Sequence, residues 1–132
     1  MRIRVTVDST NDLSPELLAR YGIAVAPLTV NLGGRLYKDL VDIMPEDIYR
    51  HVDAGGDLPK TSAVNVGEYR AFFEENLRDA DGIVHINISS EMSACHQNAA
   101  IVAEGMPVYP VDSRNLSTGS ALLALRGWDL AK

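Results

Sequence analysis

The chain has 132 residues, a length that suits a single domain able to bury roughly two-thirds of its unfolded surface. Its net charge of −6 comes from scattered acidic residues, and no basic patch of the kind that binds nucleic acid is present. No apolar run reaches membrane-spanning length, residues 1–5 do not form a signal-peptide core, and the single cysteine, Cys95, excludes an internal disulfide, so we expect a cytoplasmic protein.

Strand and helix patterns alternate along the chain. Runs of β-branched residues predict the strands, and capping residues such as Ser14 before Pro15, or Asn65 with Glu68, mark the starts of helices. In chain order we predict a strand at 3–7, a helix from Ser14 to Gly22, a strand at 23–28, a hairpin of 29–32 and 35–38 around Gly33-Gly34, a helix from Pro45 to Gly55, a loop at 57–62, a helix from Asn65 through Leu77, a strand at 83–88, a helix from about Ser93 to Gly105, a strand at 107–111 and a last helix capped by Ser117.

This order predicts an α/β fold, with a mostly parallel sheet, helices on both of its faces and a small β-hairpin. Pro27 and Pro110 lie in two of the predicted strands, and proline cannot donate to a ladder. Pro110 predicts an edge position for its strand, and Pro27 indicates either an edge or an irregularity. We find no repeat or linker, and therefore treat residues 1–132 as one domain.

Polar loops follow three of the predicted strands. They are Asp8-Ser9-Thr10, Ser89-Ser90 and Asp112-Ser113-Arg114, and the loop with Thr61-Ser62 can join them. Ligands of parallel sheets bind where loops leave the carboxyl ends of the strands. Neutral hydroxyl groups gathered there are suited to holding an anion rather than to cleaving a bond.

The segment 83–99 contains the most informative of these loops. A buried strand passes through a hydroxyl-rich loop into a helix, an arrangement that presents free backbone N–H groups and a partial positive charge to an anion. Ser93 stands where the loop becomes the helix. Its hydroxyl either caps that helix only or donates to a bound carboxylate or phosphate.

Several other side chains have both a functional and a structural interpretation. Asp8 and Asp112 are possible metal ligands, but neither has a second carboxylate close by in sequence, which favours polar turn roles. His96 is a possible base three residues after Ser93, although a surface histidine is the simpler interpretation. The interpretations that we favour for the remaining candidates are a small buried residue for Cys95, a structural role for His85, a solvated side chain for His51 and core packing for Phe72 and Phe73.

Four motifs in order resemble those of the DegV family, the bacterial fatty-acid-binding proteins. They are Val7-Asp8-Ser9-Thr10-Asn11-Asp12-Leu13, Thr61-Ser62, Ile88-Ser89-Ser90-Glu91-Met92-Ser93 and Val111-Asp112-Ser113-Arg114. The segment with Tyr37, Asp39 and Asp42 also fits, as does the helix entry at Ser117 and Gly119. The likeness covers nearly the whole chain.

The resemblance implies a two-domain protein that buries one long-chain fatty acid such as palmitate, with no cofactor and no metal. Thr61 and Ser93 would bind the carboxylate, and Ser62 and the backbone N–H of Ala94 would lie nearby. Residues that would surround this group are Asp8, Ser9, Ser89, Ser90, Asp112 and Ser113. Some members present the lipid to a fatty acid kinase, so such a kinase is an expected partner.

This chain matches only the first domain of the family and departs from its pattern in two places. Ser93-Ala94-Cys95-His96-Gln97-Asn98-Ala99 stands where the family usually has Ser-Gly-Thr-Tyr-Gln-Ser-Ala, and Ala63-Val64-Asn65 replaces a more usual polar run with proline. The alanine adds a methyl where backbone approaches the ligand. An apolar face left by a missing second domain would favour self-association.

Two hypotheses of different classes follow. The first is a carrier that holds a fatty acid by its carboxylate without making or breaking bonds. The second is a hydrolase or phosphotransfer domain that uses Asp8, Asp112 or His96.

Overall fold

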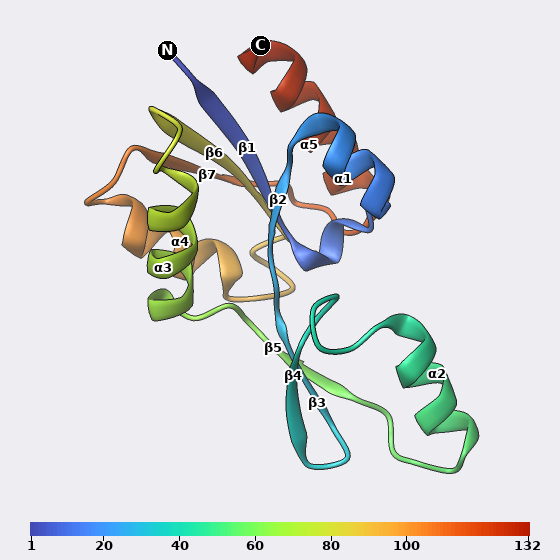
Figure 1. The fold of residues 1–132 in the computed structure, drawn as a ribbon. Coiled ribbons are helices and arrows are strands. Elements are labelled where there is room, and N and C mark those ends of the chain that lie inside the picture. The colour runs from blue at the N-terminus through green and yellow to red at the C-terminus, as the bar shows by residue number, and fades with distance from the viewer.

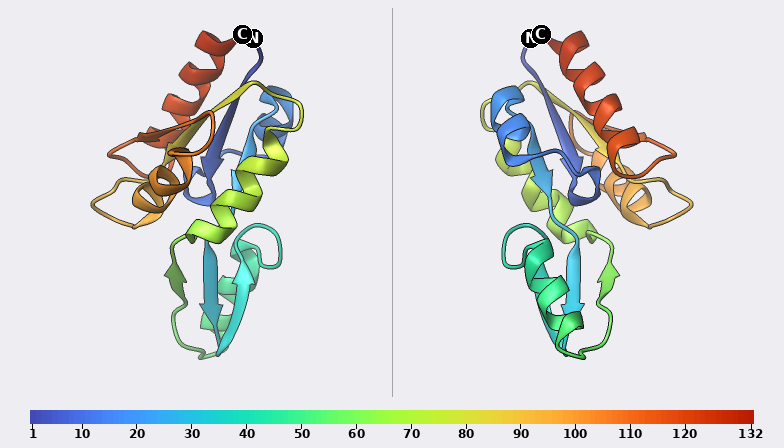
Figure 2. Two further views of the ribbon diagram at one scale, coloured as in Figure 1. Left: turned by 90° about the vertical axis from the view of Figure 1, so that its left-hand side faces the viewer. Right: turned by 90° about the vertical axis from the view of Figure 1, so that its right-hand side faces the viewer.

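The computed structural model describes all residues 1–132 and consists of two units that share one chain (Figures 1 and 2). The elements in order are β1 (Ile3–Asp8), the 3₁₀ turn η1 (Ser9–Asn11), α1 (Pro15–Tyr21), β2 (Ala24–Ala26), β3 (Thr29–Leu32), β4 (Arg35–Lys38), α2 (Pro45–Asp53), β5 (Lys60–Ser62), α3 (Val66–Asn76), β6 (Gly82–Asn87), α4 (Cys95–Ala103), β7 (Val108–Asp112) and α5 (Thr118–Ala131).

The larger unit is a four-stranded parallel sheet in the order β2-β1-β6-β7. Helices α3 and α4 cover one face, and α1 and α5 cover the other (Figure 1). The core on the α3 side centres on Tyr69, Phe73 and Ile83. Phe73 has the predicted core role, and Phe72 is partly buried and packs against this core. The doubly covered parallel sheet is as predicted, and the two proline-containing segments do end at its edges, at β2 and β7.

The smaller unit is a three-stranded antiparallel sheet in the order β4-β3-β5, with α2 beside it. Gly33 and Gly34 form the predicted hairpin turn, and both have positive φ, 59° and 79°, which suits glycine. The prediction of a loop at 57–62 was wrong in part, because β5 occupies its end. Thr61 pairs with Val30 across the antiparallel ladder, and this tertiary pairing makes a strand of a segment with no apolar alternation.

The two units are joined by two chain crossings, between β2 and β3 and between β5 and α3. Side chains tie them further. The Lys38 ammonium of β4 donates to the Glu68 carboxylate of α3 and to the Thr29 hydroxyl, at 2.9 Å. At the crossing from β5 to α3, the amide of Asn98 in α4 donates to the carbonyl of Val64 at 2.9 Å and so fixes this crossing on the larger unit. The units are therefore held at a defined separation by polar contacts as well as by the chain.

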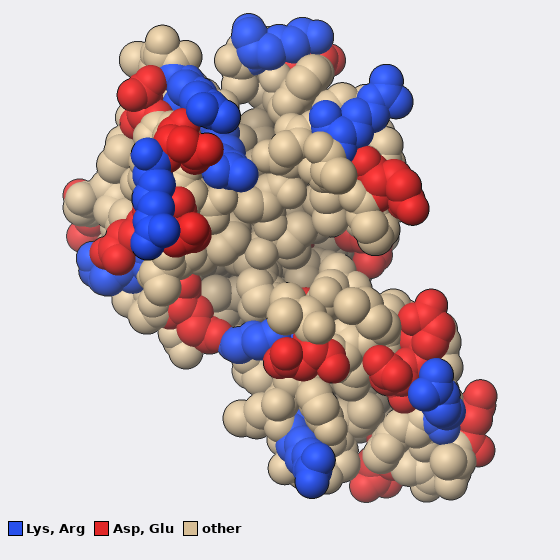
Figure 3. All heavy atoms as spheres, viewed as in Figure 1, with Lys and Arg blue, Asp and Glu red and all other residues tan.

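Charged side chains lie mostly around the rim of the face seen in Figure 3, with basic and acidic groups intermixed and an uncharged surface between the helices. No helix has the length and apolar character needed to cross a membrane. His51 differs from the expectation of a solvated side chain, because its Nε2 is buried against Gly56 and has no hydrogen-bond partner.

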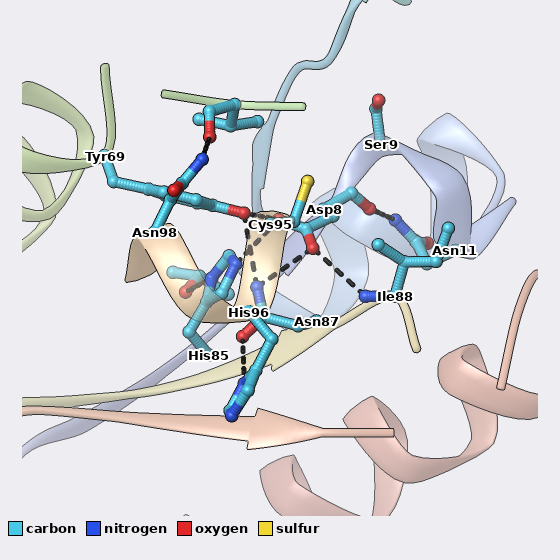
Figure 4. A network of polar contacts seen from close by, with 12 residues as sticks. Asp8, Ser9, Asn11, Tyr69, His85, Asn87, Ile88, Cys95, His96 and Asn98 are labelled. Atoms are coloured by element: carbon cyan, nitrogen blue, oxygen red, sulfur yellow. Dashed lines mark hydrogen bonds and ion pairs between the residues drawn. The ribbon is translucent and has the colours of Figure 1, made fainter. Parts of the chain in front are cut away.

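A buried carboxylate joins the ends of the two central strands (Figure 4). Asp8, only 1% exposed, ends β1 and accepts from the Tyr69 hydroxyl at 2.5 Å and from His85 Nε2 at 2.8 Å. Its other oxygen accepts from Asn87 Nδ2 at 3.0 Å and from the backbone N–H of Ile88 at 3.1 Å. His85 is thus structural, as predicted, and every oxygen of Asp8 is in use.

Burial by itself would raise the pKa of the Asp8 carboxyl, but the opposing effects are larger. The His85 imidazole, together with hydrogen bonds from His85, Tyr69 and Asn87, holds the pKa below its ordinary value. Burial and the negative charge of Asp8 raise the pKa of Tyr69, which therefore stays a neutral donor. On the far side of His85, the hydroxyl of Thr6 lies 2.7 Å from Nδ1 and completes the network.

Replacing Asp8 with Asn is expected to lower the free energy of unfolding by about 3 kcal/mol at neutral pH, because it removes the buried carboxylate that accepts from Tyr69, His85 and Asn87. A carboxyl with a depressed folded-state pKa stabilises the fold above its unfolded value of about 3.9, and this contribution is lost as pH falls through the folded value. The difference in melting temperature between parent and Asp8→Asn should therefore be constant from neutral pH down to about pH 5 and shrink below about pH 4.

Thermal unfolding followed by circular dichroism across this pH range measures the difference. Asp53→Asn is the matched control, since Asp53 is exposed at the end of α2 and makes no side-chain hydrogen bond. Equal melting curves for Asp8→Asn and parent at neutral pH would contradict the role given to this carboxylate.

The contact between Lys38 and Glu68 should contribute about 0.5–1 kcal/mol to stability, since both side chains are about one-third exposed and solvent screens the pair. A double-mutant cycle of Lys38→Met and Glu68→Gln, measured by urea unfolding, isolates this coupling. We expect the coupling to weaken as salt concentration rises. A coupling of zero at low salt would show that this contact does not help to hold the two units together.

Candidate functional site

A cleft of about 530 Å³ lies between the two units. It brings together Thr61 from β5 and Ser93 and Ala94 from the entrance to α4, three of the four residues expected at a carboxylate site. The other lining residues are Thr10, Leu28, Asp39, Ala63, Ile88, Met92 and Leu116. The walls thus combine a few polar groups with mostly apolar side chains, a composition typical of small-molecule sites.

The entrance to α4 differs slightly from the predicted cap. Ala94, not Ser93, occupies the N-cap position, with φ −79° and ψ 3°. The Ser93 hydroxyl oxygen accepts from the backbone N–H of Cys95 at 3.2 Å, and its proton faces the sulfur of Cys95 at 3.2 Å. A thiol is a weak acceptor, so the Ser93 hydroxyl can donate its hydrogen bond to a carboxylate instead.

The backbone at this helix entrance also has capacity for an anion. The N–H of Ala94 has no acceptor within the protein, and the first helical hydrogen bond to this turn is donated by Asn98 to the carbonyl of Ala94. Unpaired N–H groups at the start of a helix carry partial positive charge. Cys95 packs beneath them as a fully buried side chain, as predicted.

Thr61 reaches the cleft because of the register of β5. It lies opposite Val30 in the ladder with β3, and its neighbours in a strand point to the opposite face. Ser62, one residue further on, does not line the cleft. The hydroxyl of Thr61 makes no hydrogen bond within the protein and is exposed, so it is free to meet a ligand.

Asp39 is an acidic residue that lines the same cleft. Its backbone N–H donates to the carbonyl of Leu28 at 2.9 Å, which fixes it beside the apolar wall. Partial burial raises the pKa of this carboxyl, and the nearby charge of Asp12 raises it further, against hydrogen bonds from Ser9 and the Leu40 N–H. No Lys, Arg or His forms an ion pair with it.

Three of the residues expected around the site lie behind it and shape it. Asp8 is buried in the network of Figure 4. The Ser9 hydroxyl accepts from the N–H of Leu28 at 3.1 Å, and the Ser89 hydroxyl accepts from the N–H of Glu91 at 3.2 Å. These contacts fix the backbone of two cleft walls rather than present groups to a ligand.

Asp112 and its neighbours form a separate cluster at the end of β7. The Asp112 carboxylate accepts from the hydroxyl of Ser90 at 2.5 Å and from the backbone N–H groups of Ser90 and Arg114, both at 3.0 Å. The Ser90 hydrogen bond contributes most to holding the pKa of Asp112 below its ordinary value. The Ser113 hydroxyl accepts from the Asn115 N–H at 3.1 Å. Ser90, Asp112 and Ser113 do not line the cleft.

The three residues that a hydrolase or phosphotransfer enzyme would use are held in hydrogen bonds within the protein. Asp8 is inaccessible, Asp112 is saturated by local donors, and His96 Nδ1 lies 3.1 Å from the Asn87 Oδ1. Because Asn87 turns its NH₂ group toward Asp8, this oxygen can only accept, so His96 donates from Nδ1. No three His, Cys, Asp or Glu side chains lie close enough together to hold a metal ion.

Sequence reasoning did not assign a site role to Asp39 or to the apolar wall formed by Leu28, Ile88, Met92 and Leu116. The segment with Asp39 fits the family pattern, and this fit could have indicated a role at the site. No sequence pattern indicated the apolar residues, because they come from separate loops and strands and face one another only after the two units pack.

The chain is similar in sequence and fold to known proteins. Residues 2–132 match the family described as "Uncharacterised protein, DegV family". A DegV domain-containing protein of Caldanaerobacter subterraneus is 32% identical over 133 residues, which cover 98% of this chain and 47% of that protein. The chain therefore spans about half the length of this curated relative.

Two solved structures share the fold. The DegV family protein from Thermus thermophilus, described by its fatty acid binding, has a TM-score of 0.89 and 36% identity, over 98% of this chain and 47% of that one. DegV of Bacillus subtilis, described as a fatty acid binding protein, has a TM-score of 0.93 and 28% identity, over 98% of this chain and 47% of that one. The family match over residues 2–132, together with these similarities in sequence and fold, shows that the chain belongs to the DegV family.

Proposed function

We propose that the chain holds the carboxylate of a long-chain fatty acid such as palmitate in the cleft between its two units. The observation that carries the proposal is that Thr61, Ser93 and Ala94 line one cleft together with apolar side chains. Two hydroxyl groups and one free N–H offer three donors to the carboxylate. The similar proteins described as fatty acid binding support this choice of ligand.

Each part of the ligand has a distinct role in the proposed binding. Removing a carboxylate from water costs several kcal/mol, and charge-assisted hydrogen bonds of about 1.5–3 kcal/mol each offset this cost. Burying an acyl chain at about 0.8 kcal/mol per methylene contributes on the order of 10 kcal/mol when the chain is fully covered. The tail therefore supplies affinity and the head group supplies orientation.

The apolar rim marks the direction of the tail. Met92 is 60% exposed and Leu116 is 41% exposed, and both lie on the cleft. An acyl chain that leaves the polar end of the cleft would cover these two side chains. Full enclosure would need protein beyond this cleft, which a second domain would provide in the longer relatives.

The remaining features of the proposal follow the family. We infer that residues 1–132 correspond to the first domain of a two-domain cytoplasmic carrier that requires no metal or cofactor. A fatty acid kinase is the expected partner, to which the carrier would present the bound carboxylate. Self-association through an exposed apolar face remains a prediction for the chain alone.

A carrier is favoured over a hydrolase or phosphotransfer enzyme because the candidate catalytic groups are engaged elsewhere. Asp8, Asp112 and His96 all lie outside the cleft. Turnover of an acyl ester or a phosphate ester by the purified chain would support the enzyme instead.

Ser93→Ala is expected to weaken fatty acid binding by about tenfold or more, because the lost hydroxyl is one of few head-group donors. Binding of a fluorescent fatty acid to the purified variant measures the loss. Thr118→Ala is the control, since it removes the hydroxyl and the methyl group of an exposed threonine on α5 that makes no side-chain hydrogen bond. Equal affinity of Ser93→Ala and parent would remove Ser93 from the site.

Mass spectrometry of lipid extracted from the purified chain gives an independent readout. A saturated or unsaturated fatty acid in stoichiometric amount is expected from the parent, with depletion in a double variant of Thr61→Val and Ser93→Ala. Undiminished lipid in the double variant would place the head group at another site.

A further inference from the structure

The cleft proposed for a carboxylate is lined by one acidic residue, Asp39. Asp39 lines it beside Thr61 and Ser93 and has no cationic partner. Two ionised carboxylates in one partly buried cleft repel each other, and proteins resolve such pairs by keeping one proton between them.

We propose that fatty acid binding is proton-linked through Asp39: the ligand carboxylate and the Asp39 carboxyl take up one proton from solvent and share it as a hydrogen bond. The proposal rests on the function proposed above and adds a specificity-determining residue to that site. Asp39 would thereby change from an opposing charge into a further donor to the head group.

The surroundings of Asp39 favour the shared proton. Asp12, from the loop before α1, is the charged group that acts on it, and its negative charge and the partial burial both disfavour the ionised form. The Ser9 hydroxyl and the Leu40 N–H act in the opposite sense. Lys38, the preceding residue, points its ammonium to Glu68 and Thr29 instead.

No cation from the other walls compensates the pair. Thr10, Thr61 and Ser93 are uncharged, and the remaining lining residues are apolar. A bound carboxylate would therefore raise the proton affinity of Asp39 beyond its value in the empty cleft. Thermodynamic linkage then requires the ligand to bind more tightly as pH falls, approaching tenfold per pH unit where a full proton is taken up.

Calorimetric titration with dodecanoate at about pH 6.5, in two buffers of different ionisation enthalpy, counts the protons taken up on binding. We expect net uptake for the parent and for Asp53→Asn, which removes an exposed carboxyl from the same unit. Asp39→Asn should bind dodecanoate without proton uptake. At higher pH it should bind more tightly than the parent, because the amide N–H donates a hydrogen bond without first taking up a proton from solvent. Dodecanol, which lacks the carboxylate, should show no uptake with any variant.

Asp12→Asn provides a second test that leaves Asp39 in place. Asn tolerates the left-handed backbone at this position, where φ is 58°. Removing the neighbouring charge should shift the pH dependence of binding toward lower pH. This arm keeps the proposal falsifiable should Asp39→Asn fail to fold, which circular dichroism detects.

The outcomes separate this inference from the proposed function. Binding of dodecanoate without proton uptake, or with equal uptake in Asp39→Asn, would overturn the role of Asp39 and leave the carrier intact. Absence of dodecanoate binding in the parent would overturn both. Loss of affinity in Ser93→Ala with proton uptake confined to variants that keep Asp39 would establish both.

Discussion

The interaction on which the structure depends is the buried carboxylate of Asp8 with His85 and its other donors. It ends β1, takes the first N–H after β6, and ties α3 to both strands through Tyr69. The chain leaves the sheet toward the cleft at these same two strand ends. Burying the Asp8 carboxylate costs free energy, and its hydrogen bonds fix the ends of β1 and β6, from which the chain continues to the cleft.

The cleft itself is a product of packing between units. Its polar wall comes from the entrance to α4 in the large unit and from β5 in the small one, and its apolar wall from loops of both. Neither unit alone holds Thr61 and Ser93 together. The contacts of Lys38 with Glu68 and of Asn98 with Val64 do not line the cleft. They hold in place the segments that form its walls.

Much of this architecture was accessible from the sequence, and the failures have physical causes. Capping residues and β-branched runs identified the helices and the central strands, and prolines identified the edge strands. Lys60–Ser62 has no apolar residue, so its strand character arises only from pairing with β3. Asp8 read as a turn residue because its partners lie 61 to 80 positions away in the chain. The convergence of Thr61, Ser93 and Asp39 likewise depends on long-range packing that no local pattern encodes.

The double crossing between the units has a thermodynamic consequence for any molecule in the cleft. A ligand that touches both walls acts as an additional tether, and its binding free energy opposes the separation of the small sheet from the large one. Ligand binding and the packing of the two units against each other are therefore thermodynamically linked. Release of the ligand would therefore weaken the packing between the two units.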